Sequence, residues 1–129
     1  MSVAVLDASA LIALIRNEPG GEAVAEIIGD AQIGVVNLAE VVSHFVRNGV
    51  PFDQVNAMLK LLPMAVVPAD AALAWEAGQL REKTAAAGLS LGDRFCLALA
   101  KRAGLPAWTS DKVWNSIEND AGVKVIVIR

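Results

Sequence analysis

Cysteine is nearly absent from this sequence, and tyrosine is absent altogether. The single cysteine, Cys96, cannot form an intrachain disulfide or a cysteine-ligated zinc site, so we expect a reducing, cytoplasmic setting. Aromatic residues are limited to three Trp and three Phe. Ala, Val, Leu and Ile must therefore fill the core.

Charge is also sparse. Charged residues make up 19% of the 129 residues and hydrophobic residues 55%, which excludes a disordered chain. The formal net charge of −3 argues against a protein that coats nucleic acid by bulk attraction. No uninterrupted apolar run approaches the ~20 residues that span a bilayer, and the N-terminus shows no basic leader. We expect one domain over residues 1–129, without a membrane anchor.

Short β-type runs alternate with longer helical runs along the chain. Near-continuous apolar runs predict buried strands at residues 3–6, 32–36, 64–67, 107–109 and 123–128. Helices are predicted between them at residues 8–15, 22–28, 37–47, 52–61, 70–87 and 92–103. Asn37 and Asp70 are the predicted N-caps of two of these helices. This order predicts an α/β fold whose parallel sheet is flanked by helices on both faces.

Carboxylates occur where two of the predicted strands end. Asp7 follows the first strand, and Asp111 follows the fourth. Each could cap the helix that comes after it, which is a common use of Asp. Ligands in open α/β sheets bind beyond the carboxyl ends of the strands, so each could also serve a site. The two interpretations are compatible.

Asp93 lies at the start of a helix that is apolar on nearly all sides. It shares a helical stripe with Cys96, Leu97 and Ala100. A carboxylate above an apolar stripe is unfavourable unless it is paired or bound to a cation. The alternative interpretation is a simple attraction to the positive N-terminal end of the helix.

Glu40 lies on the polar face of the helix predicted at residues 37–47. That face is formed by Asn37, Glu40, Ser43, His44 and Arg47. A solvated surface explains the pattern, although the same face could line a cleft. His44 lies one turn after Glu40, so the two side chains can meet, but a bound metal would generate hydroxide without a histidine base.

Several carboxylates at one spot repel each other unless protons or a metal ion neutralise them. Oxygen ligands select hard cations such as Mg²⁺ or Mn²⁺, which bind phosphate oxygens and lower the pKa of bound water. With four acids assigned to such a site, the remaining formal charge is +1, because 11 basic residues then face 10 acidic ones. A nearly neutral body around a cation-loaded cleft can accept a polyanion.

At these acids the sequence resembles the PIN domain family, and within it the VapC-type ribonuclease toxins of bacterial toxin–antitoxin pairs. The resemblance rests on VLDASAL (5–11) with NEPG (17–20), NLAEV (37–41), LSLGD (89–93), and GLP (104–106) with TSD (109–111). Each motif is short, but four in the family's order and spacing are specific. The resemblance runs from about residue 3 to the end of the chain.

The resemblance implies an acidic cluster of Asp7, Glu40, Asp93 and Asp111 that performs metal-dependent RNA cleavage. Asp7, Asp93 and Asp111 would bind the Mg²⁺ or Mn²⁺ ion. The substrate would be RNA. The partners would be a second copy of the chain, forming a homodimer, and a small antitoxin protein whose segment occupies a groove near the site.

Three further residues fall at family positions that support the acids. Ser9 and Thr109 stand where members often have a hydroxyl, and Asn115 stands where some carry another acid or an amide. Asn115 is neutral, so it cannot supply a fifth charge to a second metal ion. Arg16, Arg94 and Lys112 neighbour the acidic motifs and are either ordinary solvated charges or contacts for RNA phosphates.

Two other functions stay open at this point. The chain could be a PIN-fold RNA-binding module without catalysis, or a PIN nuclease of RNA processing that is not a toxin. A phosphatase with an aspartyl nucleophile is a further alternative, but it would show Asp-x-Asp after the first strand, where this sequence reads Asp7-Ala8-Ser9.

Overall fold

The computed structural model describes all 129 residues as a five-stranded parallel sheet with helices around it. The strands are β1 (Ala4–Leu6), β2 (Ala31–Gly34), β3 (Ala65–Val67), β4 (Ala107–Thr109) and β5 (Val125–Val127). The α-helices are α1 (Ala8–Ile15), α2 (Gly21–Ile27), α3 (Val35–Arg47), α4 (Phe52–Lys60), α5 (Ala71–Thr84), α6 (Leu91–Ala103) and α7 (Glu118–Ala121). Short 3₁₀ segments are η1 (Ile28–Asp30), η2 (Ala85–Ala87) and η3 (Lys112–Ile117).

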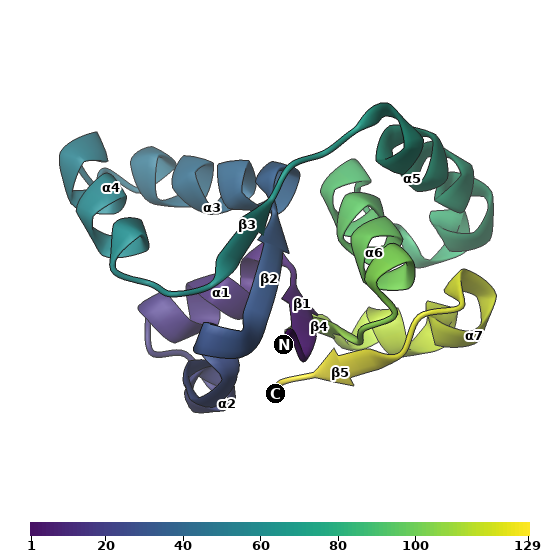
Figure 1. Cartoon of the computed structure of the whole chain (residues 1–129), viewed down its shortest axis with the longest axis horizontal. Helices are drawn as coiled ribbons and strands as arrows, with labels where there is room; N and C mark the ends of the chain where they lie inside the picture. Colours follow the sequence, from purple (N-terminus) through teal and green to yellow (C-terminus); the bar gives the residue numbers. More distant parts are fainter.

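The helices cover both faces of the sheet, with α1 to α4 on one side and α5 to α7 on the other (Figure 1). The strand side chains alternate between these two layers. Val5 of β1 belongs to the core under α5 and α6, whereas Leu6 belongs to the core under α1 and α3. The predicted α/β fold is therefore confirmed. No helix has both the length and the apolar character that a bilayer span needs.

Helix α6 lies at the centre of the α5–α7 layer. Five consecutive residues from Cys96 to Ala100 are buried, which explains why its sequence is apolar on nearly all sides. Gly104 ends the helix with a φ of 67°, a left-handed conformation that glycine adopts without strain. The two tryptophans differ, because Trp114 is fully buried in this layer and Trp75 of α5 is 74% exposed.

The predicted boundary between β2 and α3 is wrong. The strand ends at Gly34 and α3 begins at Val35, so Asn37 is not an N-cap but a buried residue of the first helical turn. The two valines suggested a longer strand, but in the helical turn Asn37 Nδ2 donates to Glu40 Oε1 and to the Gly92 carbonyl. Elsewhere, the helix predicted at residues 70–87 ends at Thr84, and the sequence after Asp111 forms η3 and α7, which were not predicted.

Strand β1 is the centre of the sheet, whose order is β3-β2-β1-β4-β5. The chain continues from β1 to β2 and β3 on one side, and then returns to β4 and β5 on the other. Leu6 pairs with Ile33 of β2 and with Trp108 of β4, so Asp7 and Thr109 emerge side by side. This reversal of strand order, beyond the carboxyl ends, is where open α/β sheets bind ligands.

Candidate active site

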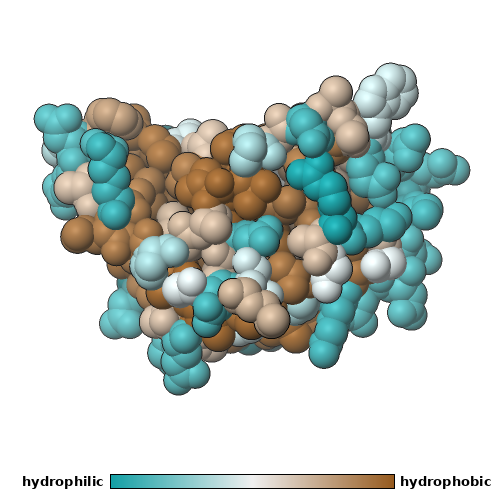
Figure 2. Space-filling view, in the orientation of Figure 1, coloured by the Kyte–Doolittle hydropathy of each residue, from teal (hydrophilic) through white to brown (hydrophobic).

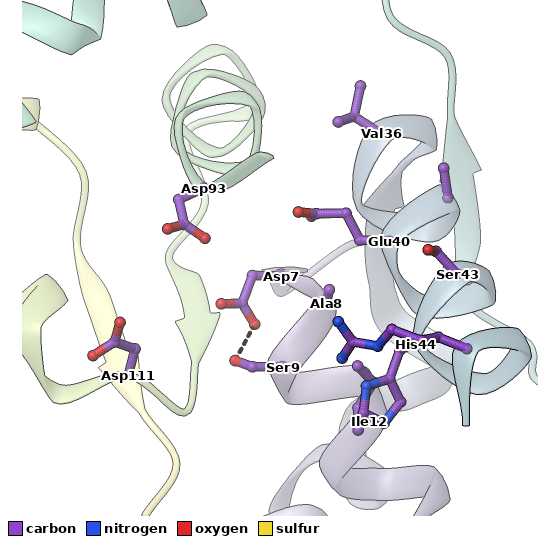
Figure 3. A pocket seen from close by; sticks show the side chains of 12 residues that line it. Asp7, Ala8, Ser9, Ile12, Val36, Glu40, Ser43, His44, Asp93 and Asp111 are labelled. Atoms are coloured by element: carbon purple, nitrogen blue, oxygen red, sulfur yellow. Dashed lines mark hydrogen bonds between the residues drawn. The ribbon is translucent and has the colours of Figure 1, made fainter. Parts of the chain in front are cut away.

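A cavity of about 690 Å³ opens at the carboxyl ends of β1 and β4. All four predicted acids, Asp7, Glu40, Asp93 and Asp111, line it. They come from four separate segments: the end of β1, the polar face of α3, the first turn of α6 and the end of β4. Figure 3 shows the Glu40 side chain extending toward the space beside Asp7 and Asp93.

Asp7 is the most constrained of the four acids, and it is 4% exposed. Its Oδ1 accepts hydrogen bonds from Ser9 Oγ at 2.7 Å and from the Ala10 backbone N–H at 2.8 Å. Its Oδ2 accepts from Thr109 Oγ1 at 2.6 Å. Asp7 thus caps α1 and lines the cavity at once.

The electrostatic environment of Asp7 disfavours its charge. Burial raises the pKa of the carboxyl from 3.8 to about 6, although hydrogen bonds from Thr109, Ser9 and Ala10 act in the opposite direction. The negative charge of Asp93 adds to the rise. Near neutral pH this carboxylate therefore gains stability from any cation that enters the cavity.

Glu40 is held between α3 and α6. The Asn37 Nδ2 donates to Glu40 Oε1 at 2.9 Å and to the backbone carbonyl of Gly92 at 3.1 Å. A Cβ at position 92 would stand 2.3 Å from Glu40 Oε2, so the carboxylate can pack on α6 only because residue 92 is glycine. Burial raises the pKa of Glu40, the Asn37 hydrogen bond lowers it, and the charge of Asp93 raises it.

Asp93 is part of a reciprocal cap at the start of α6. Ser90 Oγ accepts from the Asp93 N–H at 3.2 Å, and Asp93 Oδ2 accepts from the Ser90 N–H at 2.9 Å. Burial raises the pKa of Asp93, with a contribution from Asp111, while the contacts with Ser90 and the charge of Arg94 lower it. The residue is therefore both a helix cap and one of the acids that line the cavity.

Asp111 lies at the edge of the cavity and is exposed. Its Oδ1 accepts from the Val113 N–H at 3.0 Å, which caps η3, and Figure 3 shows its carboxylate turned away from Asp7. Its own N–H donates to Thr109 Oγ1 at 3.1 Å. Asn115 is exposed on η3 and does not line the cavity, so the structure does not bring it to the acids.

Three residues that shape the site were missed or misread in the sequence. Asn37 and Gly92 position Glu40, and a glycine inside the first turn of a predicted helix was the available signal for a close approach. Arg94 is neither solvated nor free for RNA. It is 7% exposed and donates from Nη1 to the Ala77 carbonyl at 3.3 Å, which ties α6 to α5.

The chemistry of the donors fits a hard divalent cation, because carboxylate oxygens are the ligands that Mg²⁺ and Mn²⁺ prefer. In the arrangement of this structure, no group of three or more His, Cys, Asp or Glu side chains could hold a metal ion. Binding one ion through three of these carboxylates would therefore require a change of side-chain rotamer. The exposed side chain of Asp111 has the freedom for such a change.

The sequence model of the PIN domain family matches residues 4–119 of the chain. The chain belongs to the PIN domain family. This membership was predicted from the four acidic motifs and is confirmed. PIN nucleases generally use divalent metal ions. A search of curated proteins gives no match.

Solved structures with the same fold include several toxin–antitoxin complexes. DNA-bound VapBC from Salmonella typhimurium superposes with a TM-score of 0.76 at 17% identity, with 100% of both chains covered. A toxin–antitoxin complex from Klebsiella pneumoniae gives 0.75 at 19% identity, covering 98% of each chain. VapBC-5 from Mycobacterium tuberculosis gives 0.70 at 25% identity, covering 99% of this PIN domain and 100% of that chain. The resemblance to VapC-type members is thus confirmed in the fold.

Proposed function

We propose that this PIN domain is a metal-dependent endoribonuclease and the toxin of a toxin–antitoxin pair. The observation that carries the proposal is the gathering of Asp7, Glu40, Asp93 and Asp111 around one cavity at the switch point of the sheet. Three of these carboxyl groups have raised pKa values because of burial and mutual repulsion. A bound cation would relieve both effects. The likeness to VapBC complexes supports the toxin role.

In this proposal Asp7, Asp93 and Asp111 hold the Mg²⁺ or Mn²⁺ ion. A bound ion would lower the pKa of a water molecule and offset negative charge on the phosphate. Ser9 and Thr109 keep the Asp7 carboxylate in one orientation through their hydroxyl groups. The water oxygen would attack phosphorus while a carboxylate of the cluster takes its proton. The bond from phosphorus to the ribose oxygen would break, and that oxygen would take a proton from solvent.

The proposed antitoxin has a surface on which to bind. An apolar groove of about 400 Å³ lies between α3, α4 and β3, and Figure 2 shows apolar atoms gathered over these elements. Phe52 at the start of α4 is 61% exposed at this groove. An apolar antitoxin segment would cover the groove, which adjoins the cavity through α3. Trp75, exposed on α5, would be covered in a homodimer.

Asp93→Asn is the variant that tests the proposed site. Cleavage of a labelled single-stranded RNA would be followed with Mn²⁺ and with excess EDTA. We expect the wild type to cut only with Mn²⁺ and Asp93→Asn to lose cleavage. Asp53→Asn is the matched control, since Asp53 is an exposed acid in the first turn of α4 outside the cavity. Equal cleavage by the wild type and Asp93→Asn would remove the proposed site.

Two measurements separate the alternative functions. Calorimetric titration with Mn²⁺ would show no heat of binding that depends on Asp93 if the domain were a silent RNA-binding module. Expression of the chain alone should arrest bacterial growth if it is a toxin, and co-expression of the cognate antitoxin should restore growth. An RNA-processing nuclease would cleave RNA without arresting growth.

A further inference from the structure

The cavity that holds the acids also has a basic end. Along α3 its lining passes from Glu40 through Ser43 to His44 and Arg47. Arg47 is the last residue of α3, is exposed and takes part in none of the ion pairs of the molecule. Its charge is thus available to a ligand in the same cavity as the acidic cluster.

Arg16 lies beside the His44 ring at this end of the cavity. Arg16 Nη1 lies 3.4 Å from His44 Nε2, and Arg16 Nε lies 3.6 Å from a carboxylate oxygen of Glu18. A guanidinium group can only donate, so in this contact His44 Nε2 is the acceptor and Nδ1 is the ring nitrogen left to donate. The ring also packs edge-on against Phe45, with the ring centroids 5.1 Å apart. His44 therefore offers one remaining N–H donor in a restrained ring.

We propose that His44 and Arg47 form a phosphate-binding subsite for an RNA nucleotide next to the one that is cleaved. This inference rests on the proposed nuclease function. The four acids repel the phosphates of an RNA strand. A bound metal ion would offset this repulsion for the phosphate that it contacts, but not for the neighbouring phosphates. A cation farther along the cavity offsets the repulsion felt by a neighbouring phosphate and fixes the register of the strand.

The spacing along α3 suits two phosphates of one strand. Along the helix axis, the backbone position of His44 is about 6 Å and that of Arg47 about 10 Å from that of Glu40. An extended RNA strand that lies along α3 therefore reaches the acidic end with one phosphate and the basic end with another.

Binding of a fluorescently labelled single-stranded RNA, measured by anisotropy in EDTA with the RNA shown to stay intact, tests the subsite. We expect Arg47→Ala and His44→Ala each to raise the Kd several-fold, and the double variant to raise it by more than about tenfold. Arg47→Lys should bind nearly as the wild type does. Arg81→Ala is the matched control, because Arg81 is an exposed arginine near the end of α5, also outside any ion pair.

The salt dependence gives a second readout that a structural defect would not change. Loss of one phosphate contact should reduce the slope of log K against log salt by about 0.7 in Arg47→Ala, and leave it unchanged in Arg81→Ala. Equal Kd values and equal slopes for Arg47→Ala and Arg81→Ala would overturn the subsite. The same conclusion follows if Arg47→Ala weakens binding of a short oligoglutamate peptide and leaves RNA binding unchanged.

The two proposals fail in distinguishable ways. If Asp93→Asn cuts RNA as the wild type does while Arg47→Ala binds RNA weakly, the nuclease site fails and the RNA subsite stands. If Asp93→Asn is inactive while Arg47→Ala and Arg81→Ala bind RNA equally well, the subsite fails and the nuclease site stands.

Discussion

Asp7 and Asp111 follow neighbouring strands of the sheet, and each caps the helical segment after it, yet the structure holds them very differently. Asp7 is buried and its carboxylate accepts three hydrogen bonds, from two hydroxyls and a backbone amide. Asp111 is exposed and its carboxylate accepts only from the Val113 N–H. One corner of the cavity is thus locked in place, and the other can adjust.

The comparison shows which of the two acids lowers the stability of the folded protein. A buried carboxylate is preorganised for a cation, but it destabilises the folded protein when it ionises without one. An exposed carboxylate adds little to either effect. Four substitutions test how firmly the fold must hold the acids of the cavity, in order of decreasing expected effect.

Asp7→Asn should have the largest effect, a loss of about 10²- to 10³-fold in RNA cleavage together with a gain in stability. Because burial raises the pKa of Asp7 from 3.8 to about 6, the folded protein retains this proton to a higher pH than the unfolded chain. Wild-type stability therefore falls as the pH rises from 3.8 to about 6 and stays lower above that range. Asn cannot ionise, so this contribution to the fall disappears.

Chemical unfolding in EDTA at a series of pH values measures the effect. At pH 8 the Asp7→Asn variant should exceed the wild type by at most about 3 kcal/mol in free energy of unfolding. Below pH 3.8 the two proteins should differ little from this cause. Parallel stability curves for the two proteins across this range would show that burial does not raise the pKa of Asp7.

Gly92→Ala should displace Glu40, since the new Cβ would stand 2.3 Å from its Oε2. A shift of about 1 Å at a catalytic group lowers activity by about 10²-fold. Gly78→Ala is the matched control, because no atom lies within 4 Å of a Cβ at that helical position, and the change should stabilise α5 by about 0.5–1 kcal/mol. The measurement is the rate of RNA cleavage by both variants. If Gly92→Ala cleaves RNA as fast as Gly78→Ala, Glu40 needs no fixed position.

Thr109→Val removes the hydroxyl that donates to Asp7 Oδ2 and accepts from the Asp111 N–H. We expect metal affinity or cleavage to fall by about 10- to 100-fold, as for other residues that orient metal ligands. The pKa of Asp7 should also rise, since the Thr109 hydrogen bond lowers it. Thr84→Val is the control, because the buried Thr84 hydroxyl donates to the Leu80 carbonyl far from the acids and should affect stability alone. A comparable loss of cleavage in both variants would indicate a general packing defect.

Asp111→Asn should have the smallest effect. Asn also caps helices, so the free energy of unfolding should change by less than about 0.5 kcal/mol. Cleavage should fall by less than in Asp7→Asn, and added Mn²⁺ should restore part of it. Asp70→Asn, which changes an exposed cap of α5 that pairs with Arg102, should leave cleavage unchanged. If Asp111→Asn were as inactive as Asp7→Asn, the two corners would be equivalent in function despite their different burial.

Much of the architecture could be predicted because strand and helix periods are local properties of the sequence. The apolar runs identified all five strands and the order of the main helices, and the acids at their ends pointed to the cavity. The errors fall where a side chain's partner is distant in sequence. Asn37 resembled a cap, but its partner Gly92 lies on α6, and Arg94 resembled a surface charge, but its partner Ala77 lies on α5.

The sequence alone determined that this chain is an α/β protein whose four acidic motifs place it in the PIN family. Only the tertiary structure decided that Asp7 is buried and Asp111 exposed, that Glu40 packs against a glycine, and that His44 and Arg47 share the cavity with the acids. The physical reason is that periodicity and capping depend on neighbours within a few residues. Burial, pKa and the approach of two helices depend on which residues the folded chain brings together from afar.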